Sequence, residues 1–240
     1  MSLDLTRREF LQGAGAAGAL TLAPGVFLYA KDPEAPVTDA VRWGLLVDTQ
    51  VCQEDCNACV DACNEEHNLQ DLGRPETDAQ WIRKLNVRDP LGGRTISLPM
   101  MCQHCENPPC VDVCPTGASF RREDGIVLVD KHTCIGCRYC MMACPYKARS
   151  FIHENLTEQL PDAPRGKGCV ESCTMCVHKV DAGENTTACA EACHKDGHQA
   201  ILFGDLNDPD SEISKRIREF GATQIRADLG LNTGVRYQNL

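Results

Sequence analysis

The cysteines constrain this chain more than any other feature, because 17 of its 240 residues are cysteine and all but one fall into four groups. Each group has four members and ends in C-x3-C, a repeat at the level of side chains. The groups are Cys52-x3-Cys56-x2-Cys59-x3-Cys63, Cys102-x2-Cys105-x4-Cys110-x3-Cys114, Cys134-x2-Cys137-x2-Cys140-x3-Cys144 and Cys173-x2-Cys176-x12-Cys189-x3-Cys193, and Cys169 alone is left over. An odd number of cysteines cannot be fully paired in disulfides, and a chain of this length buries a core without them. The spacing therefore favours metal ligands.

The third group, followed by Pro145, is the C-x2-C-x2-C-x3-C-P run of bacterial ferredoxins. Three cysteines on a tight loop wrap one cubane, and the fourth lies on the following helix and ligates a neighbouring cluster. Gly136 leaves room for backbone amides to approach inorganic sulfur. The apolar run Ile126–Val129, bounded by Gly125 and Asp130, predicts a short strand before the loop. The pattern therefore predicts a short strand, followed by a loop that binds a cluster and then by a short helix.

Other cysteine chemistries fit less of the pattern. The second group follows the same order with a longer loop, and the first and fourth lack the terminal proline. The fourth group taken alone also fits a zinc ribbon, which uses paired C-x2-C hooks. Covalent c-type haem needs C-x-x-C-H, and no C-x-x-C in this chain is followed by histidine. The four groups together favour iron–sulfur clusters.

The first 30 residues resemble a twin-arginine export signal. Arg7 and Arg8 precede an uncharged run, Phe10–Ala30, that is rich in glycine and alanine. The alternatives are an ordinary N-terminal helix and, if the signal is not cleaved, a retained anchor. The run Gly13–Gly18 matches G-x-G-x-x-G, but it lacks the preceding strand and the acidic residue that a dinucleotide site needs. We therefore predict an export signal over 1–30 and a linker over 31–42.

Composition and the remaining motifs exclude several functions. A net charge of −10 argues against a nucleic-acid partner, which requires a basic surface. The histidines form no triad and no H-E-x-x-H motif, so we predict no catalytic residues. Four basic residues lie near the cysteine groups in the sequence: Lys147, Arg149, Lys179 and Lys195. We favour the interpretation that they are solvated surface residues. The alternatives are that they tune cluster potentials or dock partner proteins. Within Ser211–Phe220, the helical spacing of Ile213, Ile217 and Phe220, with Gly221 after them, predicts an amphipathic helix. We favour packing of its apolar side on the core over binding to a partner.

Two segments resemble a known family. Cys102–Phe120 (CQHCENPPCVDVCPTGASF) and Cys134–Tyr146 (CIGCRYCMMACPY) are similar to the four-cluster [4Fe-4S] subunits of membrane-associated respiratory complexes, such as those of polysulfide and nitrite reduction. The resemblance extends over Trp43–Pro209. Within this family, the most similar members are the periplasmic subunits of the membrane complex associated with dissimilatory sulfite reductase. This similarity is carried by the segments Phe203–Pro209 and Arg226–Tyr237.

The resemblance implies an α+β fold of two ferredoxin-like [4Fe-4S] modules with long loops, short strands and short helices. The four-cluster domain would span 43–205, and a C-terminal helix and tail over 206–240 would pack on it or on a partner. The implied ligand sets for four [4Fe-4S] clusters are Cys102, Cys105, Cys110 and Cys144; Cys134, Cys137, Cys140 and Cys114; Cys52, Cys56, Cys59 and Cys193; and Cys173, Cys176, Cys189 and Cys63. Cys169 is unassigned and could replace a neighbour in the last two sets.

The resemblance also implies a function. It predicts a non-catalytic subunit that relays single electrons within a quinone-linked membrane complex of sulfur or sulfite metabolism. Its partners would be an integral-membrane quinone-interacting subunit and other redox subunits, with no small-molecule substrate of its own. The chain would lie on the periplasmic side, held at the membrane by partners or by an uncleaved signal. The alternatives are the iron–sulfur subunit of a molybdenum reductase or of a nitrite-reduction pathway, and a zinc-stabilised binding protein.

Overall fold

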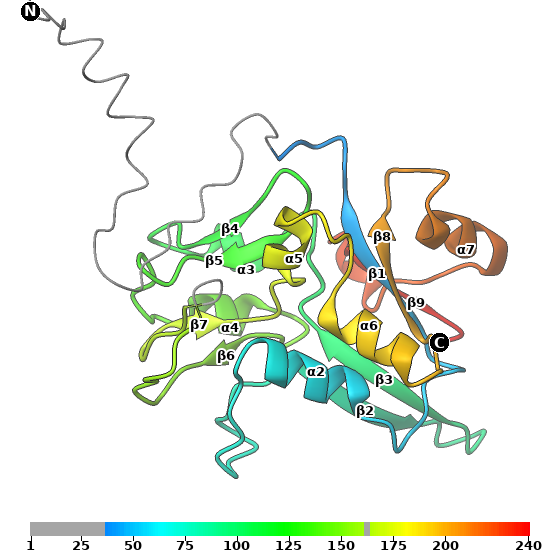
Figure 1. The fold of residues 1–240 in the computed structure, drawn as a ribbon, viewed down its shortest axis with the longest axis horizontal. Helices are drawn as coiled ribbons and strands as arrows, with labels where there is room; N and C mark the ends of the chain where they lie inside the picture. Colours follow the sequence, from blue (N-terminus) through cyan, green and yellow to red (C-terminus); the bar gives the residue numbers. More distant parts are fainter. Residues whose placement is uncertain (1–36, 161–163) are drawn as a thin grey trace, which may run out of the picture. The chain divides into compact units, whose positions relative to one another are not determined.

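The strand β1 is central to a three-stranded sheet with the order β8-β1-β9, in a computed structural model that describes residues 37–160 and 164–240 (Figure 1). The predicted signal over 1–30 and the first half of the linker over 31–42 lie outside these residues. The strands are β1 (Trp43–Asp48), β2 (Ile82–Arg88), β3 (Thr95–Met101), β4 (Ser119–Arg121), β5 (Val127–Val129), β6 (Ser150–Phe151), β7 (Val170–Glu171), β8 (Ile201–Asp205) and β9 (Val235–Gln238). The helices are α2 (Ala58–Glu66), α3 (Pro109–Asp112), α4 (Tyr139–Ala143), α5 (Val177–Asp181), α6 (Ala188–Lys195) and α7 (Glu212–Phe220), with a 3-10 turn η1 (Ala227–Leu229). Helices and strands are both present, as an α+β fold requires.

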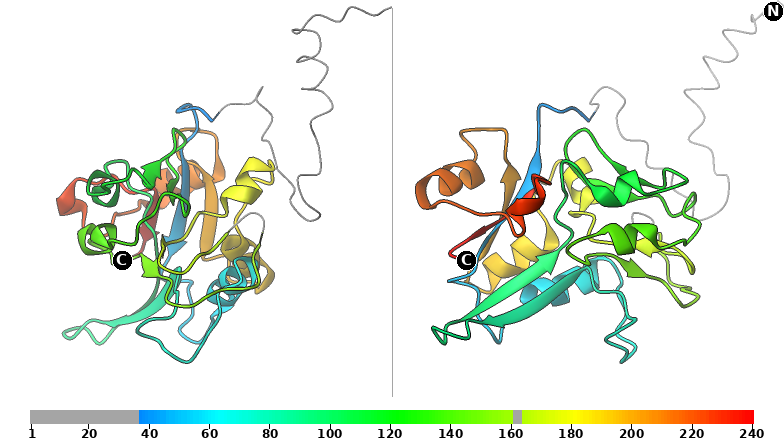
Figure 2. Two further views of the ribbon diagram at one scale, coloured as in Figure 1. Left: turned by 90° about the vertical axis from the view of Figure 1, so that its left-hand side faces the viewer. Right: turned by 180° about the vertical axis from the view of Figure 1, so that it is seen from behind.

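The three-stranded sheet joins distant parts of the sequence. β8 pairs antiparallel with β1, and β9 pairs parallel with it, so that Val47 lies opposite Tyr237. The run Leu45–Val47 is completely buried, which is typical of a central strand covered on both faces. The C-terminal segment is thus part of the sheet in which β1 is the middle strand (Figure 2).

The remaining strands form three two-stranded sheets, β2-β3, β4-β5 and β6-β7. The strand predicted over Ile126–Val129 is confirmed as β5, which begins one residue later. Two pairs of short helices accompany these sheets, with α2 against α6 and α3 against α4. Every helix of these two pairs carries at least one of the grouped cysteines.

The predicted amphipathic helix is confirmed as α7. The Ser211 side chain accepts a hydrogen bond from the Ser214 N–H, which caps the helix, and Gly221 ends it with φ of +73°. Ile213 is 0% exposed and packs on the sheet, whereas Phe220 is 60% exposed. The prediction that Phe220 also packs on the core is wrong, because most of this last helical residue is exposed to solvent.

Replacing Ile213 with alanine is expected to lower the free energy of unfolding by about 2–4 kcal/mol, because the cavity would lie against a sheet that cannot collapse into it. A Cβ atom on Gly204 of β8 would already lie 2.8 Å from the Ile213 Cγ2 atom, so the two are closely packed. Anaerobic urea denaturation measures the loss. Phe220→Ala is the matched control, and an equal loss in both variants would contradict the packing described.

Candidate metal centres

Four buried cysteines from two sequence groups lie together after strand β3. The Cys105 thiol interacts electrostatically with the thiols of Cys102, Cys110 and Cys144. Cys102 and Cys105 lie in the loop after β3, Cys110 is in α3, and Cys144 follows α4. We call this set site A. Its fourth member comes from the third sequence group, because α3 and α4 pack side by side.

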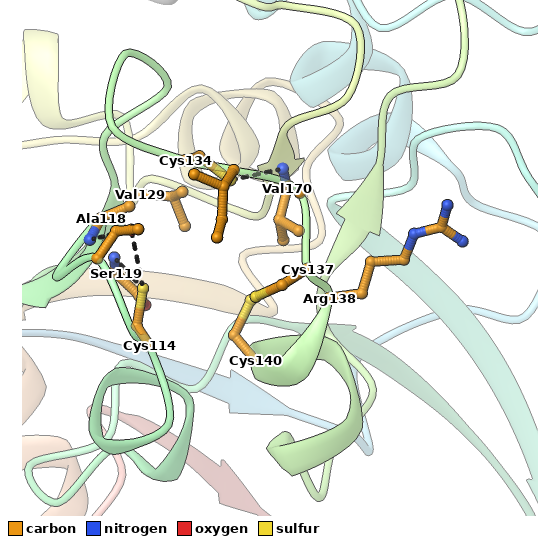
Figure 3. A pocket seen from close by; sticks show the side chains of 12 residues that line it. Cys114, Ala118, Ser119, Val129, Cys134, Cys137, Arg138, Cys140 and Val170 are labelled. Carbon is orange, nitrogen blue, oxygen red and sulfur yellow. Dashed lines mark hydrogen bonds between the residues drawn. The ribbon is translucent and has the colours of Figure 1, made fainter.

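Site B consists of Cys114, Cys134, Cys137 and Cys140, which line one pocket (Figure 3). Its members face a common space from the loop before β4, from the tight loop after β5 and from α4. Cys137 is solvent-exposed, in contrast to the buried members of site A.

Backbone N–H groups are directed at two thiols of site B. The Ser119 N–H donates to the Cys114 Sγ over 3.3 Å, and the Val170 N–H donates to the Cys134 Sγ over 3.5 Å (Figure 3). Burial disfavours ionisation of Cys114, but hydrogen bonds from Ser119 and Thr116 outweigh it and hold the pKa of this thiol below its ordinary value. Such donors stabilise a thiolate, which is the form that binds metal.

The first and fourth sequence groups meet where α2 packs against α6. Cys59 and Cys63 are four residues apart on α2, and Cys189 and Cys193 are four apart on α6, so each pair shares one helix face. The Cys59 thiol interacts with those of Cys52, Cys56 and Cys193, and we call these four cysteines site C. Site D consists of Cys63, Cys173, Cys176 and Cys189, whose thiols also interact electrostatically. Cys189 interacts with Cys59 as well, so sites C and D adjoin.

Cys169 lies beside site B. Its thiol donates to the Lys131 carbonyl oxygen over 3.3 Å and interacts electrostatically with Cys134. The expectation that it could replace a ligand in the set formed by the first and fourth groups is therefore wrong. The reason is the pairing of β6 with β7, which positions the residue before β7 against the loop after β5.

Burial keeps most of these thiols protonated in the chain alone. It raises the pKa of several to about 12, with neighbouring thiols adding to the effect: Cys59, Cys102, Cys105 and Cys176. Because thiolates are the metal ligands, metal binding must release these protons, and site formation is coupled to folding.

Buried donors without acceptors lie at site A and fit an iron–sulfur cluster. The His104 Nδ1 accepts from the Val127 N–H over 2.9 Å, which leaves the ring proton on Nε2, and that atom has no partner among the described residues. The Nε and Nη1 atoms of Arg149 also lack partners there. A buried donor without an acceptor costs about 1–3 kcal/mol. Sulfide and thiolate sulfur in a bound cluster would accept these hydrogen bonds.

The structure corrects the favoured interpretation of one residue and adds one group of residues that the sequence analysis did not identify. The interpretation of Arg149 as solvated surface is wrong, because its side chain is buried, whereas Lys147 and Lys195 are exposed. Asp196 and His198 lie close to Cys56, whose thiol donates to the Asp196 carboxylate over 3.2 Å. Neither feature has a sequence signal, since both depend on contacts between distant segments.

Comparison with known proteins agrees with this geometry. Residues 94–205 match the 4Fe-4S dicluster domain, and residues 4–24 match the twin-arginine translocation pathway signal sequence, which confirms the predicted export route to the periplasm. The chain is 43% identical to the Hdr-like menaquinol oxidoreductase iron-sulfur subunit 1 of Archaeoglobus fulgidus, over 98% of each protein.

Other relatives belong to several enzyme complexes. The chain is 39% identical to the iron-sulfur subunit of a putative dimethyl sulfoxide reductase of Halobacterium salinarum, over 82% of this chain and 79% of that protein. It is 36% identical to the protein NrfC of Escherichia coli, over 94% of this chain and 91% of that protein. A subunit of the tetrathionate reductase of Salmonella typhimurium is 35% identical, over 91% of this chain and 81% of that protein. These relationships confirm that the chain belongs to the family of [4Fe-4S] iron–sulfur subunits that carry electrons in oxidoreductase complexes.

Proposed function

We propose that the chain relays single electrons through four [4Fe-4S] clusters, one at each of sites A to D, within a quinone-linked complex. The observation that carries this proposal is the exchange of cysteines between sequence groups. Cys144 lies with the second group and Cys114 with the third, as expected for two-cluster ferredoxins. Sites A and B would form one ferredoxin-like module, and sites C and D the other.

The chain contributes ligands and an electrostatic environment to this function. The sixteen grouped cysteines would hold the irons as thiolates, and a bound [4Fe-4S] cluster supplies reversible uptake of one electron. Backbone N–H groups donate to five ligand sulfurs, and such hydrogen bonds raise the reduction potential. The donors at site B are Ser119 and Val170, and those at sites C and D are Met175, Ala188 and Ala200.

Site B is the proposed contact with a redox partner. Cys137 is exposed there, and three large apolar side chains of the same segment are exposed as well: Ile135, Tyr139 and Met142. Apolar groups exposed together are typical of protein interfaces. Because electron transfer slows steeply with distance, an exposed cluster ligand surrounded by a docking surface suits transfer between subunits.

Membrane association is proposed to come from partner subunits. Within residues 37–160 and 164–240, none of the helices is sufficiently long and apolar to span a bilayer. The Archaeoglobus relative is named as part of a menaquinol oxidoreductase, which supports an integral-membrane quinone-interacting partner for this chain. A role in sulfur or sulfite metabolism, with the partner complex of the dissimilatory sulfite reductase branch, is part of the same proposal.

A molybdenum reductase complex is the second candidate. It is favoured by the relatives named as subunits of dimethyl sulfoxide and tetrathionate reductases. The two candidates share the four clusters and differ in partners. Molybdenum analysis of the complex isolated with this chain separates them, because the quinone-linked candidate requires no molybdenum-containing subunit.

Anaerobically purified protein is expected to contain about sixteen irons and as many acid-labile sulfides per chain, because four cubanes each hold four of both. Iron and sulfide analysis, together with EPR spectroscopy after stepwise reduction with dithionite, measures this directly. Eight or fewer irons, or zinc in their place, would contradict the assignment of a cluster to every site.

A further inference from the structure

Arg149 is a buried cation between sites A and B. Its side chain is 6% exposed and lies between α3 and α4, where Nη2 donates to the Cys110 Sγ over 3.1 Å and to the Ser119 Oγ over 2.8 Å. The same guanidinium lies within electrostatic reach of Cys102 of site A and Cys140 of site B. One arginine therefore faces ligands of two different sites.

The counter-charge of Arg149 is not a carboxylate. Among the described residues, no aspartate or glutamate forms an ion pair with it, whereas the similarly buried Arg165 pairs with Glu171 over 2.8 Å. Burial of an unpaired charge is strongly unfavourable, so a buried arginine requires an anion. The groups beside Arg149 that become anionic on cluster binding are the thiols of sites A and B.

Sites C and D have no comparable cation in the part of the chain that the structure describes. Cys56 of site C lies near the negative charge of Asp196 and the positive charge of Lys84. Cys176 of site D lies near the negative charge of Glu66 and the positive charge of Lys179. These side chains are all partly or fully exposed, so solvent screens their charges. Within the described residues, the buried, uncompensated positive charge thus lies with sites A and B.

We propose that Arg149 is the shared counter-cation of the clusters at sites A and B and raises the reduction potentials of both. The proposal rests on the proposed function, which supplies the clusters. Reduction adds one negative charge to a cluster, and a fixed cation in a low-dielectric interior stabilises that charge. Loss of this cation would therefore lower the reduction potentials of the clusters at sites A and B and leave those at sites C and D unchanged.

The test is an anaerobic redox titration of the full chain, followed by EPR, in the wild type and in Arg149→Met. Two of the four reduction steps are expected to move to more negative potentials in the variant, while the other two stay unchanged. Arg236→Met is the matched control. Arg236 is also partly buried, but its electrostatic neighbours are Arg42 and Glu106 rather than cysteines, so we expect no shift.

The Arg149→Lys variant distinguishes the effect of the positive charge from the effect of side-chain packing. It also replaces Arg149→Met in the test if the methionine variant does not retain its clusters. Lysine keeps the positive charge without the planar fork, so its shift should be smaller than that of methionine. Equal shifts in both variants, unchanged potentials in both, or a uniform shift of all four steps would overturn the proposal. Iron content is measured separately in the wild type, so a chain without four clusters is recognised as a failure of the proposed function instead.

Discussion

A chain that lacks both Cys102 and Cys144 is expected to lose one cluster and retain three, with about twelve irons. The two residues belong to different sequence groups, yet both thiols lie at site A beside Cys105 and Cys110. Removing two of four thiolates leaves too few ligands for that cubane, and the other three sites keep complete ligand sets. Iron analysis of anaerobically purified Cys102→Ala/Cys144→Ala protein measures the number.

The matched control removes two cysteines of the same sequence group. Cys102 and Cys114 lie at sites A and B respectively, so Cys102→Ala/Cys114→Ala leaves three ligands at each of two sites. It should alter two clusters and leave only the other two, with about eight irons, intact. If each sequence group instead held its own cluster, the two double variants would exchange their iron contents. The comparison therefore tests the exchange of ligands between groups independently of protein yield.

Replacing Gly136 with alanine is expected to abolish the cluster at site B and to destabilise the protein by more than the about 1–3 kcal/mol typical of an overpacked core. Gly136 has φ of +70°, and a Cβ atom there would overlap the carbonyl oxygen of Gly168. Both atoms are backbone or fixed to it, so the loop that carries Cys134 and Cys137 must move. Iron content and anaerobic urea denaturation measure the two effects.

Gly117→Ala is the control for backbone conformation alone. Gly117 has φ of +69°, but a Cβ atom there would meet nothing within 4 Å. Its loss should be limited to the about 1–2 kcal/mol cost of a left-handed conformation, and the cluster should remain. Equal effects of the two substitutions would show that φ, rather than the approach of Gly168, requires glycine at position 136.

The sequence predicted those helices, strands and loops whose formation depends on residues close together in the chain. The apolar run before the third cysteine group predicted β5, and the helical spacing of apolar residues before Gly221 predicted α7. Gly136 was expected to leave room for inorganic sulfur, and the structure adds the close approach of Gly168. The spacing of the cysteines predicted metal ligands, whereas their division into sets came from family resemblance, because it depends on which helices pack together.

Features that depend on distant segments were missed for that reason. The burial of Arg149 results from its position between α3 and α4, and nothing in the run Ala148–Ser150 distinguishes it from surface. Cys169 lies beside Cys134 because β6 pairs with β7, although its sequence neighbours belong to the fourth group. The parallel pairing of β1 with β9 likewise joins elements near opposite ends of the chain, and no short window contains that information.

The position of β9 has a consequence for biosynthesis. All 17 cysteines lie in the sequence between β1 and β9, so every cluster ligand has been synthesised before the second edge of the central sheet can form. During translation, β1 therefore has one edge without a partner until residues 235–238 emerge from the ribosome. A chain interrupted before residue 235 would retain an open strand edge, a feature that exposes proteins to aggregation and degradation.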